Sequence, residues 1–409
     1  MPEPLKTDTV TGLLAEIADV GRDRQRGGYS RPVFSAAERD LTGWFTAHAE
    51  RRGLDVHTDP NGILWASMGD MSAGDCVVTG SHLDSVPGGG SFDGPLGICS
   101  ALVAVDRLRE RAIAPGRPLA IAVFPEEEGS RFGVACLGSR LLTGAIDPDR
   151  ARSLRDEDGD TLAEVAAASG LDPRFFGQDD GTLAAMGTFL ELHVEQGRGL
   201  VDLARPVGIA RSILGHGRWR IAIGGQGNHA GSTLMADRRD PMVTAARIVV
   251  AVREAALAYP DARATVGRLT PIPGGTNVIA SSVDLWLDVR HPQDEIAAAV
   301  VERIATEAGR MATEEGCTVQ VTEESLSGTV HFPSGLRDRL SHILPGSPLI
   351  DTGAGHDAGV LSTRVESAML FVRNPTGVSH SPEEHVEADD AEAGSIALAD
   401  ALQALLTRG

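Results

Sequence analysis

GSHLDSVPGGGSFDG, residues 80–94, is the stretch from which the organisation of the chain can be inferred. A short apolar run, Cys76–Val78, precedes it, and apolar residues recur at helical spacing after it, from Leu96 to Leu108. Continuous apolar runs are typical of buried strands, and a three-to-four-residue spacing is typical of a helix with one buried face. The sequence therefore predicts a buried strand, a glycine-rich loop and a helix.

The glycine-rich loop carries three side chains that suit a metal ion: His82, Asp84 and Asp93. An imidazole and carboxylates held together at the carboxyl end of a strand are common ligands of divalent metals. The alternative is a purely structural loop, in which His82 caps the strand and the glycines only form turns. A phosphate-binding loop is disfavoured, because the sequence lacks the Lys-Ser/Thr pair of a P-loop and the spacing of a dinucleotide-binding motif.

The composition describes a globular protein of more than one domain. The chain has 409 residues, of which 42% are hydrophobic and 23% are charged. A chain of this length usually forms more than one hydrophobic core. Its net charge of −20 argues against binding to nucleic acids or anionic membranes, which attract basic surfaces. No apolar run approaches the roughly 18 residues of a membrane span, and the N-terminus lacks a signal-peptide core. The four cysteines form no C-x-x-C pair, so we expect a cytoplasmic protein with free thiols.

Three further strand-like segments, two of them continuously apolar and one (Thr188–Val194) alternating apolar and polar residues, lead to residues that could bind metal or transfer protons. They are Leu119–Phe124 before Glu126, Glu127 and Glu128, Thr188–Val194 with His193, and Met369–Val372 before His380. Taken singly, the glutamates could form a solvated acidic turn and His193 could be a histidine at the core edge. The carboxyl ends of strands in an open α/β sheet meet at one crevice, so we expect these residues to converge. Histidines with carboxylates are the ligand types of a two-metal hydrolytic centre.

The pattern changes between about Ser212 and Leu326, which predicts a second domain. Strand-like and helix-like segments follow one another there in the order β-α-β-β-α-β, the order of a split βαβ unit. The residues after this segment resume the earlier pattern, so the second domain is predicted to be an insertion. We predict a discontinuous α/β domain formed by residues 1–211 and 328–409, and an inserted α+β domain formed by residues 212–327.

Seven motifs, in this order, resemble the amidase branch of the metallopeptidase M20 family. They are GSHLDSVPGGGSFDG, EEEGSRF, ELHVEQG, GGQGNHAGST, GGTNVIASS, GAGHDA and SHSPEEH, and they span nearly the whole chain. The branch includes N-carbamoyl-L-amino-acid hydrolases, allantoate amidohydrolases and β-ureidopropionases. The resemblance implies a catalytic domain with a mixed sheet, like that of zinc hydrolases, and an inserted ferredoxin-like domain that serves as lid and dimerisation domain.

The resemblance also implies the ligands of two divalent metal ions. Asp93 would bridge the two ions. His82 and His193 would be terminal ligands of opposite metals, Glu128 would share a metal with one of them, and His380 would complete the other. Zinc fits this set of histidines and carboxylates, and manganese, cobalt or nickel would bind similar ligands.

Other residues near the metals have roles that the resemblance implies. Glu127 would be the general base that takes a proton from the bridging water. Asp84 would orient His82 through its second ring nitrogen. Glu126 is expected to be a solvated neighbour, and the Asp93–Gly94 peptide is expected to be cis and strained.

The substrate contacts implied by the resemblance come from both domains. The substrate-binding residues would be Gln196, His216, Asn277, Arg290 and Gly355. Asn277 and Arg290 would hold a carboxylate, and Gln196 would bond the ureido group. His229 would stabilise the oxyanion and would reach the site from the partner subunit of a homodimer.

These residues together predict a binuclear amidohydrolase that cleaves the carbamoyl C–N bond of a ureido carboxylate. The substrate would be an N-carbamoyl-L-amino acid or allantoate, and the products would include ammonia and carbon dioxide. One alternative is an M20 peptidase or N-acyl-amino-acid deacylase with the same metals. A second is a metal-free binding or regulatory protein, and a third, a nucleotide-dependent enzyme, is disfavoured by the absence of phosphate-binding motifs.

Overall fold

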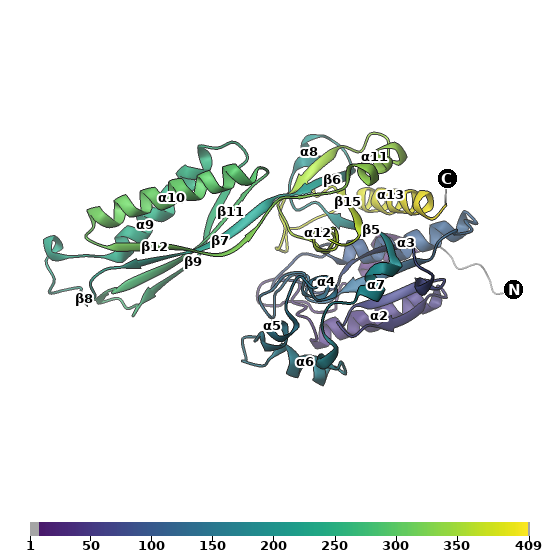
Figure 1. Cartoon of the computed structure of the whole chain (residues 1–409), viewed down its shortest axis with the longest axis horizontal. Coiled ribbons are helices and arrows are strands. Elements are labelled where there is room, and N and C mark those ends of the chain that lie inside the picture. The colour runs from purple at the N-terminus through teal and green to yellow at the C-terminus, as the bar shows by residue number, and fades with distance from the viewer. Residues whose placement is uncertain (1–7, 408–409) are drawn as a thin grey trace. The chain divides into compact units, whose positions relative to one another are not determined.

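The computed structural model describes residues 8–407 and divides the chain into two compact units (Figure 1). Unit 1 comprises Met1–Arg211 with Phe332–Gly409, and unit 2 comprises Ser212–His331. Each unit has its own hydrophobic core. The predicted fold class, a mixed α/β sheet with an inserted α+β unit, is confirmed.

The larger sheet is mixed and has nine strands, in the order β1-β2-β4-β3-β5-β15-β6-β13, in which β14 also pairs with β6. It belongs to unit 1 except for β13 and the last two residues of β6, which belong to unit 2. The strands are β1 (Asp55–Thr58), β2 (Leu64–Met68), β3 (Cys76–His82), β4 (Leu119–Phe124), β5 (Met186–Val194), β6 (Val207–Ile213), β13 (Val330–His331), β14 (Leu349–Thr352) and β15 (Glu366–Val372). The central strands β4, β3, β5 and β15 run parallel to one another, and β1, β2, β6 and β13 pair antiparallel. The parallel strands β3 and β4 are buried along their whole length, and β4 is wholly apolar because both of its faces are buried.

The helices of unit 1 cover the sheet and the loops at its edge. They are α1 (Val10–Glu16), α2 (Ala36–Arg51), α3 (Pro95–Glu110), α4 (Leu137–Thr143), α5 (Pro148–Ser153), α6 (Leu162–Ala168), α7 (Asp180–Ala185), α8 (Gly199–Asp202), α11 (Ser334–Ile343), α12 (Asp357–Leu361) and α13 (Ala388–Leu406), with 3-10 turns at Met71–Ala73 and Pro173–Phe175. Helices α3 and α13 pack against each other and on the central strands. Figure 1 shows α3 and α13 adjacent within unit 1.

The pleat of β5 decides which of its side chains face the helices and which face the opposite side of the sheet. Leu190, Leu192 and Val194 join the core formed with α3 and α13. Successive side chains of a strand point to opposite faces, so Glu191 and His193 point away from that core. Helix α12 packs on β5 as well, and its Ala358 N–H donates to Glu191 Oε2.

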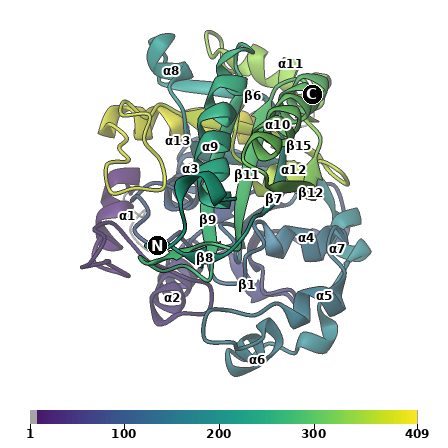
Figure 2. The same cartoon turned by 90° about the vertical axis from the view of Figure 1, so that its left-hand side faces the viewer.

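Unit 2 is a four-stranded antiparallel sheet covered by two helices. The strands are β7 (Gly215–Gly224), β9 (Arg263–Ile272), β11 (Ser282–His291) and β12 (Thr318–Ser327), in the order β12-β7-β11-β9. Figure 2 shows α9 (Pro241–Leu257) and α10 (Asp294–Glu314) side by side. A two-stranded pair, β8 (Asn228–His229) with β10 (Val278–Ile279), and a 3-10 turn at Met235–Asp237 complete the unit.

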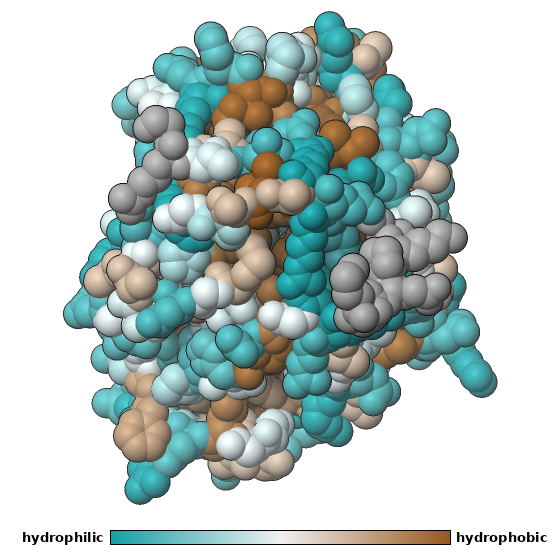
Figure 3. All heavy atoms as spheres, turned by 90° about the vertical axis from the view of Figure 1, so that its right-hand side faces the viewer, coloured by the Kyte–Doolittle hydropathy of each residue, from teal (hydrophilic) through white to brown (hydrophobic). Residues whose placement is uncertain are grey.

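The surface of the protein is mainly hydrophilic on the face that Figure 3 draws, where hydrophobic residues appear only in scattered patches. Among residues 8–407, no helix has both the length and the apolar character that crossing a membrane requires. All four cysteines are free.

Candidate active site

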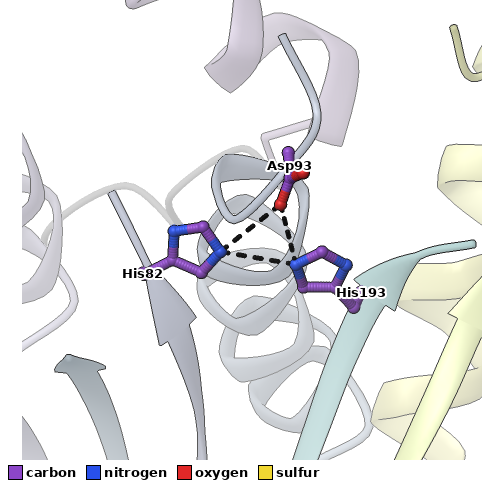
Figure 4. A group of neighbouring side chains, drawn as sticks. All are labelled: His82, Asp93 and His193. Atoms are coloured by element: carbon purple, nitrogen blue, oxygen red, sulfur yellow. Dashed lines mark hydrogen bonds and ion pairs between the residues drawn. The ribbon is translucent and has the colours of Figure 1, made fainter. Parts of the chain in front are cut away.

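Three side chains meet at the carboxyl ends of β3 and β5, as Figure 4 shows. His82 ends β3, His193 is the penultimate residue of β5, and Asp93 lies in the loop before α3. The Nε2 atoms of His82 and His193 lie 3.5 and 3.1 Å from Asp93 Oδ1 and 3.4 Å from each other. All three side chains are buried. Their ligand atoms converge as the donors of a divalent metal site would.

Asp93 also belongs to a second group, with Glu128 and His380. His380 Nε2 lies 3.5 Å from Asp93 Oδ2 and 3.3 Å from Glu128 Oε2. The two groups therefore use different oxygen atoms of one carboxylate, Oδ1 and Oδ2. All five predicted ligands come together in this way, and Asp93 is the residue that the two groups share.

The grouping of the histidines differs from the prediction that His82 and His193 belong to opposite metals. They belong to the same group, and Glu128 is grouped with His380. The reason is the order of the strands: β3 and β5 are parallel neighbours, with Gly80 opposite Glu191. Two residues further along, His82 and His193 stand side by side at the ends of their strands.

The tautomers of both histidines leave the Nε2 atoms free to bind a cation. His82 Nδ1 lies 3.0 Å from the backbone oxygen of Asp84, and His193 Nδ1 lies 3.0 Å from the backbone oxygen of Val194. A ring nitrogen that faces a carbonyl oxygen carries a proton, so in the neutral rings the lone pair is on Nε2, which faces Asp93.

The electrostatics of the site show an excess of buried negative charge. Burial, and then the charge of Asp93, raise the pKa of Glu128 well above its usual value. Burial tends to lower the pKa of His82, but the charge of Glu127 and contacts with Asp84 and Asp93 hold it well above normal. Glu128 Oε1 is buried without a hydrogen-bond partner among the described residues. Buried carboxylates with an orphaned oxygen are costly, and a bound cation would remove that cost, so the residues present fit divalent metals.

Asp84 fixes the turn after β4 through its carboxylate. Its Oδ1 accepts the backbone N–H of Glu127 and its Oδ2 accepts that of Glu128, each at 3.2 Å. The carboxylate lies 3.6 Å from His82 Nδ1, so the ring is held mainly by the backbone oxygen of Asp84. Asp84 thus connects the end of β3 to the end of β4.

Glu127 faces the first group without belonging to either group of candidate ligands. Its Oε2 lies 3.6 Å from His82 Nε2, and its Oε1 lies 3.6 Å from Cys136 Sγ and 3.8 Å from His356 Nδ1. Burial raises the pKa of Glu127 well above its usual value; the charge of His82 opposes this effect and that of Asp357 adds to it. A carboxylate beside the ligands but not among them is placed to transfer a proton.

Glu126 is not the solvated neighbour that we predicted. It is only 1% exposed, and its Oε1 accepts the backbone N–H groups of Arg131 and Phe132 at 2.9 and 2.6 Å. Glu126 has a left-handed φ of 55°, so its side chain points in a different direction from those of Glu127 and Glu128. Its carboxylate closes the turn, and this bonding explains why a third consecutive glutamate is buried here.

The expected cis peptide at Asp93–Gly94 is also wrong. Among residues 8–407, the only cis peptide is Ile272–Pro273. The sharp turn is made instead by Gly94, which has a φ of 82°. A Cβ at Gly94 would lie 2.6 Å from Nδ1 and from the backbone oxygen of His82, so the site has room only for glycine there.

Two of the predicted substrate-binding residues lie in unit 1. Gln196 Nε2 lies 2.9 Å from Asp93 Oδ2 and 3.2 Å from His380 Nε2, beside the second group of candidate ligands. Its Oε1 is buried without a partner among the described residues. Gly355 is exposed, two residues before α12.

In unit 2, His229 and Asn277 lie together on the β8–β10 pair. His229 pairs with Val278, and the backbone oxygen of Asn277 accepts the Ala230 N–H at 3.0 Å. His229 Nδ1 accepts the N–H groups of the following Gly231 and Ser232, at 3.0 and 3.2 Å. Its ring proton is therefore on Nε2, where it can be donated.

His216 and Arg290 lie directly opposite each other on β7 and β11. The Arg290 guanidinium donates to both carboxylate oxygens of Asp288, at 2.7 and 3.0 Å. Burial, and then the positive charge of Arg290, lower the pKa of His216. A neutral imidazole and a guanidinium side by side offer hydrogen-bond donors that could face an anion.

Several residues near the candidate ligands were not predicted as site residues. They are Cys136, Ser139, Glu191, Asp357, Ser379 and Glu384. Glu191 and His193 form a third group of possible ligands with His356, and neither ring nitrogen of His356 has a hydrogen-bond partner among residues 8–407. The alternation of β5 could have revealed Glu191, which lies two residues before His193 and so on the same face. Asp357, Ser379 and Glu384 lie within the motifs GAGHDA and SHSPEEH, but the sequence does not show that these segments meet, because they are distant from the other ligands.

Comparison with known proteins identifies the relatives of this site. The model of the family described as "Peptidase family M20/M25/M40" matches residues 78–404 of this chain. An N-carbamoyl-L-amino acid amidohydrolase of Geobacillus stearothermophilus is 35% identical over 93% of this chain and 94% of its own. An allantoate amidohydrolase of Bacillus subtilis (strain 168) is 32% identical over 97% of each chain. The crystal structure of an amidase of the hydantoinase/carbamoylase family from Burkholderia multivorans has a TM-score of 0.83 and 28% identity, over 98% of this chain and 97% of that one.

Proposed function

The chain belongs to the M20/M25/M40 peptidase family, and on this premise we propose that it hydrolyses the carbamoyl C–N bond of a ureido carboxylate with two metal ions. It is an amidohydrolase that acts on non-peptide C–N bonds, as its relatives are. The substrate would be an N-carbamoyl-L-amino acid or allantoate. Water would attack the ureido carbon, and the products would be ammonia, carbon dioxide and the amine.

The observation that carries the proposal is the pair of three-residue groups that share Asp93. His82, Asp93 and His193 would hold one cation, and Asp93, Glu128 and His380 would hold the other. Zinc suits this mixture of imidazole and carboxylate ligands, and manganese, cobalt or nickel are the other candidates. When bound, the two cations would activate the attacking water and polarise the ureido oxygen.

Glu127 would act as the general base and then as the general acid. It would take a proton from the attacking water and deliver it to the leaving nitrogen. Its contacts support this role, because Oε2 faces His82 of the first ligand group, Oε1 contacts Cys136 and His356, and no backbone N–H among residues 8–407 donates to either oxygen. Asp84 would hold the turn that presents Glu127.

The substrate would be held by residues of both units. Arg290 and Asn277 would bind its carboxylate, Gln196 would bond the ureido group, and Gly355 would offer a backbone contact. His216 lies opposite Arg290 on the neighbouring strand and would add a hydrogen-bond donor to the same carboxylate site. His229 would donate its Nε2 proton to the oxyanion, which the fixed tautomer supports.

We also propose a cytoplasmic homodimer in which His229 serves the active site of the partner subunit. Support for an interface through unit 2 comes from the outward face of α9. Its exposed apolar residues are Met242, Val243, Val249, Val250 and Leu257. This apolar stripe recurs at seven-residue spacing and is interrupted by the exposed Arg253 and Glu254, and such a surface favours protein contact. The four free cysteines fit a reducing compartment.

The test is a substrate panel with the purified, metal-loaded protein. We expect ammonia release from at least one of allantoate, N-carbamoyl-L-alanine, N-carbamoyl-L-methionine and N-carbamoyl-β-alanine, and none after chelation. N-acetyl-L-methionine, assayed for release of free methionine, should not react. Hydrolysis of that compound alone would favour an N-acyl-amino-acid deacylase. A protein that binds no Zn²⁺ or Mn²⁺ and cleaves nothing would be a binding protein.

A further inference from the structure

Glu384 is a buried carboxylate to which neither the motifs nor the proposed reaction assign a task. It lies between β15 and α13 and is 4% exposed. Its Oε1 accepts two consecutive backbone N–H groups, those of Phe92 and Asp93, each at 3.0 Å. Glu384 thus bonds the main chain at Asp93, the candidate ligand that the two groups share.

The other carboxylate oxygen of Glu384 is linked to the same aspartate by a second route. Ser379 Oγ lies 3.3 Å from Glu384 Oε2 and 3.3 Å from Asp93 Oδ2. Ser379 precedes His380, the candidate ligand of the second group. Glu384 therefore connects the loop of Asp93 to the loop of His380 through both of its oxygens.

The loop of Asp93 is shaped to receive this carboxylate. A Cβ at Gly90 would lie 2.2 Å from Glu384 Oε1 and 2.6 Å from Glu384 Cβ. Even the smallest side chain at position 90 would have to displace Glu384. The carboxylate also lies beside the amino end of α3, where the helix dipole favours a negative charge.

We propose that Glu384 is a positioning residue that fixes the distance between Asp93 and His380 and so sets the affinity for the metal ions. The inference rests on the metal centre proposed above. Asp84 also bonds two consecutive amides beside a candidate ligand, those of Glu127 and Glu128, but with one oxygen on each amide. Groups that hold metal ligands in place typically contribute 10–100-fold to metal affinity.

The experiment is a Co²⁺ titration of the metal-stripped protein, followed by the visible absorption of the bound ion. Glu384→Ala should weaken Co²⁺ binding about 10–100-fold, and Glu384→Asp should weaken it similarly, because the shorter side chain cannot reach the two amides. Glu384→Gln keeps an oxygen acceptor at the same distance, so its affinity should stay within about threefold of the wild type. Glu383→Gln is the matched control, since Glu383 is exposed and should not change binding.

The glutamine and aspartate variants distinguish a positioning role from a purely electrostatic one. If the charge of Glu384 were what mattered, Glu384→Gln would bind as weakly as Glu384→Ala, and the proposal would be overturned. Wild-type affinity in Glu384→Asp would overturn it too, and this variant decides the question if Glu384→Ala does not fold. Gly90→Ala should weaken binding at least tenfold without any change to Glu384 itself. His82→Ala tests the metal centre separately: wild-type binding in that variant would refute the centre, not the role of Glu384.

Discussion

At the residue scale, the carboxylates of the candidate centre differ in what their oxygen atoms contact. Both oxygens of Asp84 accept backbone N–H groups, and Glu126 accepts two with one oxygen. Among residues 8–407, the Glu127 side chain accepts no backbone N–H, and its polar contacts are with a thiol and two imidazoles, at 3.6–3.8 Å. A carboxylate with few hydrogen bonds keeps its affinity for protons, which is the property that a general base needs.

Glu127→Gln should therefore stop turnover without removing the metals. The amide has a similar shape but cannot carry a proton between water and the leaving nitrogen, so kcat should fall about 10²–10⁴-fold. Metal content per chain should equal that of the wild type, because Glu127 is in neither ligand group sharing Asp93. Ammonia release and elemental analysis measure the two quantities, with Glu157→Gln, on the surface, as control. Normal hydrolysis by Glu127→Gln would remove Glu127 from the mechanism.

Arg290→Ala should raise KM much more than it lowers metal affinity. A charge-assisted pair of hydrogen bonds to a substrate carboxylate contributes about 1.5–3 kcal/mol, or roughly tenfold to a hundredfold in KM. Initial rates over a range of substrate concentrations give KM, and Co²⁺ titration gives metal affinity. Arg303→Ala, on the exposed side of α10, is the control. An unchanged KM would show that Arg290 does not bind the carboxylate.

Glu38, on α2, predicts a pH-dependent effect on stability. Burial, and then the charge of Asp84, raise its pKa from 4.5 to about 7. A raised carboxyl pKa means that the folded state favours the protonated form of Glu38. The protonated form therefore contributes to the free energy of unfolding below the pKa of the unfolded state, and this contribution is lost as the pH rises through the pKa of the folded state. Glu38→Gln mimics the protonated form. It should leave the free energy of unfolding unchanged near pH 4 and raise it by on the order of 1–3 kcal/mol near pH 8.

Urea unfolding at the two pH values measures this difference. Glu50→Gln is the matched control on the same helix, since Glu50 is exposed. Equal effects of Glu38→Gln at both pH values would contradict the argument, because a packing change would not depend on pH in this range.

At the element scale, the candidate centre depends on the close approach of α3 to the strands that carry the histidines. Gly97, in the first turn of α3, makes this approach possible. A Cβ there would lie 2.3 Å from the backbone oxygen of Leu192 on β5 and 2.8 Å from Ser81 Cβ on β3. The helix that follows Asp93 thus rests directly on the residues that precede His82 and His193.

Gly97→Ala should destabilise unit 1, whereas Gly43→Ala should stabilise it. The added methyl at position 97 has no room, and overpacking of this kind costs about 1–3 kcal/mol. Gly43 is also inside a helix, α2, but nothing lies within 4 Å of a Cβ there. Replacing it by alanine should add about 0.5–1 kcal/mol through helix propensity alone. Urea unfolding of the two variants should therefore shift in opposite directions, and a stabilising Gly97→Ala would disprove the close packing.

At the scale of the whole molecule, the proposed dimer predicts complementation between inactive variants. Glu127→Gln and His229→Ala homodimers should each be inactive. If His229 serves the partner's site, a mixed dimer has one complete site of two, so the purified mixed dimer should have about half of wild-type activity. The two variants would be co-expressed with different tags, and the mixed dimers purified and assayed for ammonia release.

Two outcomes would contradict this arrangement. No recovery in the purified mixed dimer would mean that His229 acts within its own subunit or not at all. A monomeric wild type in sedimentation experiments would exclude the dimer. Val250→Glu, which places a charge on the apolar stripe of α9, should convert the dimer into monomers, whereas Glu254→Gln on the same helix should not.

Local patterns specify the elements and the types of residue that meet. Continuous apolar runs specify β3 and β4, and alternation of apolar and polar residues specifies β5. The alternating and helical patterns of residues 212–327 specify the second sheet and its helices, because these periodicities are local. The motifs supplied His82, Asp93, Glu128, His193 and His380.

How these residues are grouped depends on the folded chain. His82 and His193 share one oxygen of Asp93 because β3 and β5 are neighbours, and strand order results from long-range packing that no local pattern encodes. The contact of Glu384 with the Asp93 loop was hidden for the same reason. Its carboxylate is bonded by the N–H groups of Phe92 and Asp93, which are distant in the sequence and come near it only when the chain folds.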